Sequence, residues 1–122
     1  MWTANLSNGE VRKDGILVGS FYSGHGAGKN NPALENVHEF GPIPRGSWTI
    51  AGPPFDHADH GPYCLRLEPE KETVTFGRTG FLWHGDSVQH PGEASKGCMI
   101  SLYIVRMRVH QSGDTRLEVI ST

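Results

Sequence analysis

Short apolar runs separated by turn residues dominate the hydrophobic pattern of this chain. Runs of this length, with turn signals on both sides, are typical of β-strands rather than of helices. Near the N-terminus, Ser7-Asn8-Gly9 and Asp14-Gly15 supply the positive φ angles that tight hairpins require, which predicts a meander over about the first twenty residues. Further strands are predicted at four other apolar runs, which are Trp48–Ile50, Tyr63–Glu68, Phe81–Trp83 and Leu117–Ile120.

Two segments depart from this strand pattern. Residues 23–46 are rich in glycine, asparagine and proline and have no helical or strand period, which predicts a long ordered loop over the sheet. Residues 102–110 fit a helix, through Leu102, Val105 and Val109, and also fit a strand, because apolar and polar residues alternate from Val105 onward. In the helical interpretation, Ser101 is the N-cap and residues 112–114 end the helix.

Length and charge narrow the class of protein. A chain of 122 residues with 36% hydrophobic residues is predicted to form a single domain, 1–122, because it is long enough for one core and too short for two. The net charge is −2 and there is no run of lysine or arginine, so no nucleic acid or anionic membrane is expected as a partner. No apolar run approaches the ~20 residues that a membrane span needs.

The N-terminal residues and the cysteines indicate the cellular compartment in which the protein is made. Residues 1–10 lack the basic and apolar regions of a signal peptide, which predicts synthesis as a soluble protein in the bacterial cytoplasm. The two cysteines, Cys64 and Cys98, do not make a disulfide framework, and both are predicted to be reduced. Cys64 is interpreted as a small, inert hydrophobic residue.

A cysteine and a histidine carry the candidate chemistry. The strand predicted at Phe81–Trp83 ends at His84, which Gly85 follows at once. Cys98 follows Gly97, where the backbone can turn tightly and bring N–H groups close to a bound carbonyl. An imidazole activates a cysteine when it takes the thiol proton or pairs with the thiolate. His84 and Cys98 are therefore predicted to be a catalytic pair.

These residues lie in a pattern that resembles a known family. His84-Gly85, followed by Ser95-Lys96-Gly97-Cys98-Met99, is similar to the His-Gly and Ser-x-Gly-Cys signature of the L,D-transpeptidase catalytic domain (YkuD-like). Nearly the whole chain resembles a compact branch of that superfamily, the DUF2778 or Tlde1-type domains. Ordinary L,D-transpeptidases have histidine in place of Lys96 and arginine in place of Ile100, and both departures favour the compact branch. The other motifs of the resemblance are Tyr22–Gly26, Asn30–Pro32, Gly41–Gly46 and Phe76–Phe81.

The resemblance implies a fold and an activity. The fold is mainly β, a sandwich or open barrel of the L,D-transpeptidase type, with one short helix after Cys98. The activity is that of a cysteine L,D-transpeptidase or L,D-carboxypeptidase that needs no cofactor. Cys98 would attack the bond between a diamino acid and D-alanine in peptidoglycan stem peptides, and His84 would transfer the protons. The Gly85 carbonyl would hold the imidazole, and N–H groups around Gly97 and Cys98 would stabilise the oxyanion.

Other motif residues are predicted to contact the substrate. The resemblance places the loop that contains Tyr22 and Ser23 at the mouth of the site, and Ser95 belongs to the cysteine motif. Arg78 and Lys96 are cations beside the proposed nucleophile, and each would meet a substrate carboxylate, favour the thiolate or only be solvated. The acceptor remains open, since water, a D-amino acid or a second stem peptide would each complete the reaction.

The implied substrate also predicts a place of action. Peptidoglycan lies outside the inner membrane, so the protein is expected to act in the periplasm or cell wall after specialised export or lysis. The compact branch includes toxins that are injected into rival bacteria, which would imply an immunity protein as a partner. A phage-borne wall enzyme fits the same residues.

Three alternatives stay open. Asp86 would orient His84 as carboxylates do in catalytic triads, or it would only begin a turn. A non-catalytic wall-binding protein with the same fold would explain the departures at positions 96 and 100. A zinc peptidase is a third possibility, although no His-Glu-x-x-His or Cys-x-x-Cys motif occurs and no metal is predicted. The histidines that such a site would use are His57, His60, His84 and His90.

Overall fold

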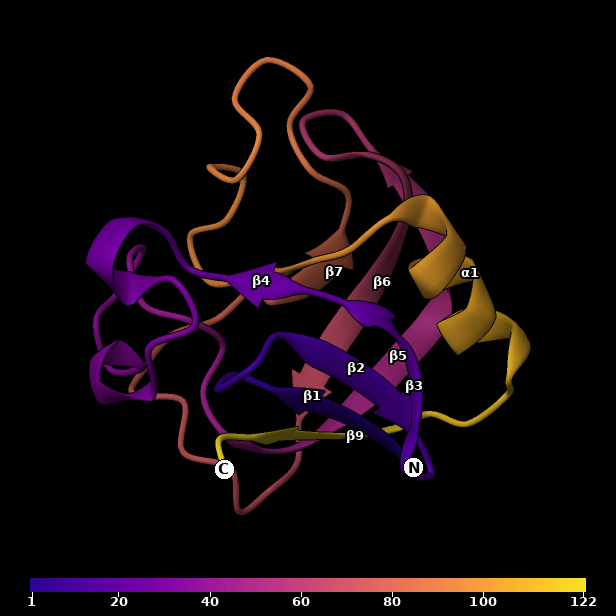
Figure 1. The fold of residues 1–122 in the computed structure, drawn as a ribbon, viewed down its shortest axis with the longest axis horizontal. Coiled ribbons are helices and arrows are strands. Elements are labelled where there is room, and N and C mark those ends of the chain that lie inside the picture. The colour runs from indigo at the N-terminus through magenta and orange to yellow at the C-terminus, as the bar shows by residue number, and fades with distance from the viewer.

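The computed structural model describes residues 1–122 and shows a mainly β fold with one short helix, as predicted (Figure 1). Nine strands form one mixed sheet in the order β3-β2-β1-β9-β5-β6-β7-β8-β4. Neighbouring strands are antiparallel except in the parallel pairs β1–β9 and β7–β8. The strands are β1 (Trp2–Asn5), β2 (Glu10–Lys13), β3 (Ile16–Ser20), β4 (Tyr22–Ser23), β5 (Gly46–His57), β6 (Gly61–Pro69), β7 (Leu82–His84), β8 (Met99–Ile100) and β9 (Arg116–Ile120).

The N-terminal meander is confirmed. β1 pairs with β2 and β2 pairs with β3, both in antiparallel register. The turn between β2 and β3 consists of Asp14, with a φ of 49°, and Gly15, with a φ of 86°. Positive φ at both positions is what a tight hairpin turn requires, and Asp-Gly provides it at little cost.

The sheet curls back on itself. Its two edge strands, β3 and β4, are consecutive in the sequence and are separated by Phe21 alone. The backbone N–H of Phe21 donates to the carbonyl oxygen of Gly9 at 2.9 Å. One continuous segment therefore supplies both edges of the sheet, which agrees with an open barrel and leaves little unpaired strand edge.

Three tryptophans anchor the core inside this curl. Trp2, Trp48 and Trp83 are each at most 2% exposed and pack with aliphatic side chains from both halves of the sheet. Each indole N–H has a partner at 3.0 Å, since Trp2 donates to Ser112 Oγ, Trp48 to the Pro44 carbonyl and Trp83 to Ser101 Oγ. Large aromatic side chains thus fill the core without leaving an unsatisfied polar group.

The long loop is confirmed as ordered and largely irregular. It contains only two short 3₁₀ turns, Gly26–Gly28 and Pro32–Leu34. Its glycines are needed where two stretches of loop backbone touch. A Cβ on Gly28 would lie 2.2 Å from the Phe40 carbonyl oxygen, and a Cβ on Gly41 would lie 1.8 Å from the Leu34 carbonyl oxygen. No other residue fits these positions without moving the backbone.

The ambiguous segment after Cys98 is a helix, α1 (Tyr103–Gln111). Val105 and Val109 are buried, and Val105 packs so closely on β3 that a Cβ on Gly19 would lie 2.5 Å from its methyl group. The predicted N-cap is wrong, because Leu102 occupies that position without a side-chain cap. The Ser101 hydroxyl is used elsewhere, since it donates to the Ser20 carbonyl at 2.8 Å.

The two ends of the sheet differ in character. The loop after β7 and the hairpin between β5 and β6 rise side by side at one end (Figure 1), and both line the same cleft. The N- and C-termini lie at the opposite end (Figure 1). We therefore expect the functional site at the end that carries the two loops, since loops on a rigid scaffold commonly carry function.

Candidate active site

Cys98 and His84 lie on the same face of the sheet. The parallel register pairs His84 on β7 with Ile100 on β8. Cys98 precedes β8, two positions before Ile100, and alternate residues of a strand point to one face. The register therefore places the two residues on one face of neighbouring strands, and no hydrogen bond joins their side chains.

His84 is buried and presents a free ring nitrogen. Nδ1 lies 2.8 Å from the Gly85 carbonyl oxygen, and because a carbonyl only accepts, Nδ1 carries the proton. Nε2 is buried and has no hydrogen-bond partner. Burial lowers the pKa of His84 to about 4, with smaller contributions from His60 and Arg106, while the Gly85 carbonyl acts in the opposite direction. The ring is therefore neutral at pH 7 and can accept a proton at Nε2.

A stack of imidazoles covers His84. The ring of His60 lies 4.1 Å from that of His84 between centroids, at an interplanar angle of 18°, and the ring of His57 lies 4.4 Å from that of His60. His57 is the last residue of β5, and His60 lies in the turn to β6. The tip of the β5–β6 hairpin therefore excludes water from the His84 ring and helps to keep the pKa of His84 low.

Cys98 is half-buried and lines a cleft of about 280 Å³. Its sulfur lies 3.9 Å from the carbonyl oxygen of Gly80. Burial raises the pKa of Cys98 above its ordinary value of 9.0, while the N–H of Leu82 and the guanidinium of Arg78 act to lower it. At neutral pH the residue is therefore a thiol beside a neutral imidazole. To act as a nucleophile, this thiol would need a base to take its proton.

Buried serines hold the loop that carries Cys98. The Ser95 hydroxyl donates to the Cys98 carbonyl at 2.5 Å and accepts from the N–H groups of Gly24, at 2.8 Å, and Gly97, at 3.1 Å. Ser23, which is 0% exposed, donates to the Gly97 carbonyl at 2.9 Å. The Gly97 amide is therefore engaged within the chain, whereas the Cys98 amide makes no hydrogen bond. Of the two predicted oxyanion donors, the Cys98 N–H is the free one.

Arg78 ties the same loop to the glycine-rich loop. It is 6% exposed, and its guanidinium donates to backbone carbonyls only. Nη1 donates to Glu35, at 2.6 Å, and to Pro42, at 2.7 Å. Nη2 donates to Gly41, at 3.0 Å, and to Lys96, at 3.3 Å. One side chain thus joins two loops that are distant in sequence, next to the cysteine.

Comparison with protein families gives one match. The family model of the Tlde1 domain matches residues 19–115, which is most of the chain. The chain belongs to the Tlde1 domain family. Tlde1 domains are toxin effector domains of bacteria. No curated protein matches the chain.

The family match covers the candidate site of this Tlde1 domain but not the whole sheet. It includes the glycine-rich loop, β5 to β8 and α1, and hence the complete candidate site. It leaves out β1, β2 and β9, which are neighbours in the sheet. The only α-helix, α1, is too short and too polar to cross a membrane.

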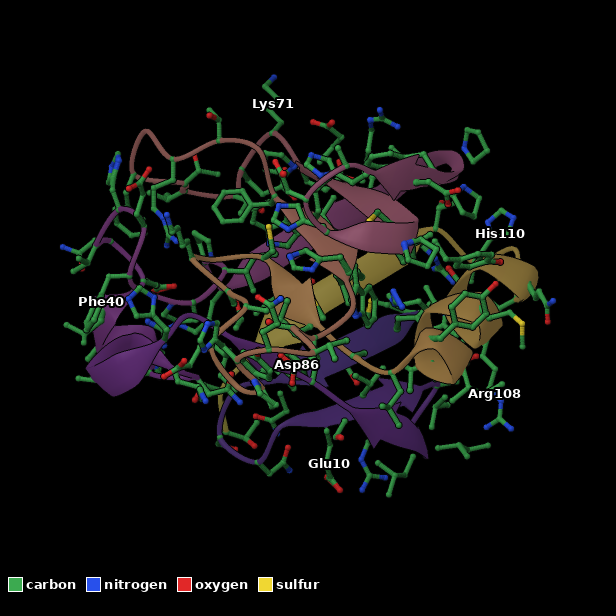
Figure 2. All side chains as sticks on the ribbon, turned by 90° about the horizontal axis from the view of Figure 1, so that it is seen from above. Glu10, Phe40, Lys71, Asp86, Arg108 and His110 are labelled. Atoms are coloured by element: carbon green, nitrogen blue, oxygen red, sulfur yellow. The ribbon has the colours of Figure 1, made fainter.

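Two clefts flank the pair in this Tlde1 domain. His84 lines the larger cleft, of about 1060 Å³, together with Asp86 and part of α1. Cys98 lines the smaller one, where Lys96 is exposed. Figure 2 looks down on this face and places Asp86 between the loop that carries Phe40 and the end of the molecule formed by α1. A peptide that contacts both clefts would cross the pair.

Asp86 organises its own loop rather than the imidazole. Its carboxylate accepts from the hydroxyl of Tyr22 at 2.6 Å, from the N–H of Ser87 at 2.8 Å and from the N–H of Gly92 at 3.1 Å. Because Nδ1 of His84 already donates to a backbone carbonyl, the interpretation of Asp86 as a turn residue is the one that the contacts favour.

The residues predicted to bind substrate fall into two groups. Tyr22 lines the larger cleft and Lys96 the smaller one, so both are placed to meet a ligand. Ser23 and Ser95 are buried with their hydroxyls engaged, and the Nη1 and Nη2 groups of Arg78 donate to carbonyls of the chain. In this structure these three position the loop around Cys98.

Sequence reasoning considered His60 only as a possible zinc ligand and did not single out Arg106. His60 stacks on His84, although its Asp- and His-rich surroundings are typical of a solvated turn. Arg106 on α1 is buried beside Gly85 and lines the larger cleft. Its sequence context, alternating valines, methionine and arginines, contains no signal that one of the arginines faces inward.

The histidines of the zinc alternative do not form a ligand set. His57, His60 and His84 are stacked, so their ring nitrogens do not converge on one point. His90 is exposed, with Nδ1 3.8 Å from the carboxylate of Glu93. No group of three or more histidine, cysteine, aspartate and glutamate side chains is arranged to hold a metal ion.

Gly97→Ala is expected to disrupt the cysteine loop. Gly97 has a φ of 138°, and a Cβ there would lie 2.4 Å from Nη2 of Arg78. The substitution therefore combines backbone strain with a clash against a buried cation, and we expect a loss of about 2–4 kcal/mol in unfolding free energy. Gly113→Ala is the matched control, because its φ is 72° but nothing lies within 4 Å. Equal midpoints for the two variants in urea unfolding would refute the close-contact explanation.

Proposed function

We propose that this Tlde1 domain is a cysteine L,D-carboxypeptidase or L,D-transpeptidase that acts on peptidoglycan stem peptides. The observation that supports this proposal most is the arrangement of His84 and Cys98. Nδ1 of His84 is held by a backbone carbonyl, Nε2 is free, and the residue lies on the same sheet face as the half-exposed Cys98. Apo structures often show longer catalytic contacts than substrate complexes do, so adjacency without a hydrogen bond fits this role. Membership of a toxin effector family supports a bacterial target.

In the proposed reaction, the Cys98 sulfur attacks the carbonyl carbon of the diamino acid while Nε2 of His84 takes the thiol proton. The carbonyl oxygen becomes an oxyanion, to which the free Cys98 N–H donates. The C–N bond then breaks, His84 returns the proton to the amine of D-alanine, and a thioester remains on Cys98. Water hydrolyses this thioester and restores the thiol. A D-amino acid amine would give exchange instead, and a second stem peptide would give a cross-link.

The test is release of D-alanine from purified tetrapeptide muropeptides, followed by mass spectrometry. We expect the wild-type domain to release D-alanine and Cys98→Ala to be slower by about 10³-fold or more, because it lacks the nucleophile. Cys64→Ala is the matched control. The thiol of Cys64 is buried, donates to the Gly61 carbonyl at 3.4 Å, and has a pKa that burial raises, so its loss should leave release within about threefold of wild type.

Other outcomes have definite meanings. Release that persists in Cys98→Ala overturns the proposal, and loss of that residual release on chelation would support a zinc peptidase. A folded wild-type domain that releases nothing also overturns it, and would leave a wall-binding protein as the remaining interpretation.

The same proposal includes a place of action. Stem peptides lie in the periplasm and cell wall, so we propose that the domain acts there after specialised export or lysis, and that an immunity protein in that compartment is its partner. Wild-type chain directed to the periplasm of a host cell should then stop growth, while Cys98→Ala should not. Equal toxicity of wild type in the cytoplasm would contradict this placement.

A further inference from the structure

Arg106 is a buried cation without an acidic partner. It lies on α1, is 3% exposed and forms no salt bridge. Nη1 makes two long hydrogen bonds, to the carbonyl oxygens of Pro62, at 3.4 Å, and Tyr63, at 3.3 Å. Nε is buried with no partner, and Nη2 makes no hydrogen bond. A buried guanidinium is costly unless an anion and further hydrogen bonds satisfy it, so these unused donors need an explanation.

The guanidinium lies beside the proposed base. A Cβ built on Gly85 would lie 3.0 Å from Nη2 and 3.4 Å from Nη1 of Arg106, so the cation covers the residue that directly follows His84. Arg106 also lines the larger cleft, and it is the only lysine or arginine that does so. The contrast with Arg78 is sharp, because Arg78 donates to four backbone carbonyls. Arg106, which also lies over the ring of Tyr103 at 5.6 Å, is therefore the cation with unused donors on the His84 side of the catalytic pair.

We propose that Arg106 binds the α-carboxylate of the amino acid whose amine reacts at His84. The inference rests on the proposed function, in which His84 protonates the departing amine of D-alanine or deprotonates an incoming amine. In an α-amino acid, one carbon separates the amine from the carboxylate. An amine within hydrogen-bond reach of Nε2 thus carries its carboxylate a few ångströms away, into the part of the cleft that Arg106 lines. The unpaired Nε–H and Nη2–H suit the two oxygens of a carboxylate.

This assignment defines the class of ligand. The larger cleft takes an α-amino acid with a free carboxylate, either as the leaving D-alanine, as a free D-amino acid acceptor or as the free α-amino acid end of a diamino acid side chain. Amines and amino acid amides lack the anion and leave the buried guanidinium unsatisfied. A site that pairs a buried polar group with its ligand discriminates strongly against ligands without the partner group.

The experiment compares two donors, a tetrapeptide stem that ends in D-alanine and the same stem that ends in D-alaninamide. For the wild-type domain we expect kcat/KM to be about 100-fold or more higher for the free acid. In Arg106→Gln the ratio should fall to about threefold or less, mainly through loss of activity on the acid, and Arg106→Lys should restore part of it. Arg108→Gln, on the exposed side of the same helix, is the matched control and should keep the wild-type ratio.

The outcomes separate this inference from the proposed function. An Arg106→Gln variant that loses activity equally on both donors shows that Arg106 only supports the fold, and a wild type that does not discriminate overturns the inference directly. If Arg106→Gln does not fold, D-alanine and D-alaninamide are titrated against the wild-type domain while the Nε–H NMR resonance of Arg106 is followed. Only D-alanine should shift it, and equal responses would refute the site. This titration decides the matter even if no turnover is found.

Discussion

His84→Gln is expected to lower the rate of D-alanine release by about 10²–10⁴-fold, which is the usual contribution of a general acid–base residue. Glutamine keeps a polar side chain of similar reach but cannot take the Cys98 proton or return it to the leaving amine. The loss should appear mainly in kcat, because glutamine is similar to histidine in size and reach and so changes little of the larger cleft that His84 lines. His110→Gln, an exposed histidine at the end of α1 (Figure 2), is the control and should keep the wild-type rate.

The same substitution should change how stability depends on pH. The pKa of His84 is about 4 in the folded protein, against 6.5 for an unperturbed histidine. At a pH between these values, the unfolded chain binds a proton at His84 and the folded chain does not. The free energy of unfolding of the wild type therefore falls as the pH falls from 6.5 to about 4. A shift of this size corresponds to about 3 kcal/mol. Relative to wild type, His84→Gln should thus gain stability at pH 4.5 compared with pH 7.5 in urea unfolding. A parallel pH dependence in the two proteins would refute the buried, neutral state of His84.

Arg78→Met is expected to cost about 3 kcal/mol or more in unfolding free energy. The guanidinium is buried and satisfies carbonyls from Glu35, Gly41, Pro42 and Lys96, which methionine would leave without a donor. In a domain of this size the loss should lower Tm by about 10 °C or more. The cysteine loop loses its anchor, so release of D-alanine should fall as well.

Arg108→Met provides the comparison for Arg78→Met. It removes an exposed arginine from α1, where methionine is equally compatible with a helix. Its Tm should remain within about 2 °C of wild type. If Arg78→Met matched it in differential scanning calorimetry, the four carbonyl contacts would contribute little to stability.

Local signals explain what the sequence predicted well about the fold. Asp14-Gly15 encodes a turn through its own φ preferences, and short apolar runs bounded by turns encode strands, so the meander and the later strands were foreseeable. The parallel pairing of β1 with β9 joins the two ends of the chain and has no local signature. The role of Ser101 was misjudged for a related reason. Its hydroxyl serves Ser20, a residue far away in the sequence, and not the adjacent helix.

The candidate site likewise combines features that the sequence predicted with features that it did not. Motif spacing predicted His84 and Cys98 as a pair. The register puts them on one face of neighbouring strands, and the contact between His84 and the Gly85 carbonyl is present. Burial and engagement depend on tertiary packing, which a motif does not report. Arg78 was interpreted as a cation for the substrate or for the thiolate, and its guanidinium donates to three carbonyls of the glycine-rich loop and to that of Lys96. Arg106 has an unremarkable sequence context, and only packing against Gly85 distinguishes it from Arg108.

Both termini lie at the end of the sheet opposite the loop after β7 and the β5–β6 hairpin (Figure 1), which line the larger cleft. The strands next to the termini, β1 and β9, lie outside the family match. A carrier domain, a secretion adaptor or an affinity tag joined at either terminus would consequently extend away from these two loops. Tethered and free forms of the domain should then turn over soluble muropeptides equally well. On the proposed route of specialised export, this geometry would keep attachment to a carrier separate from the proposed chemistry.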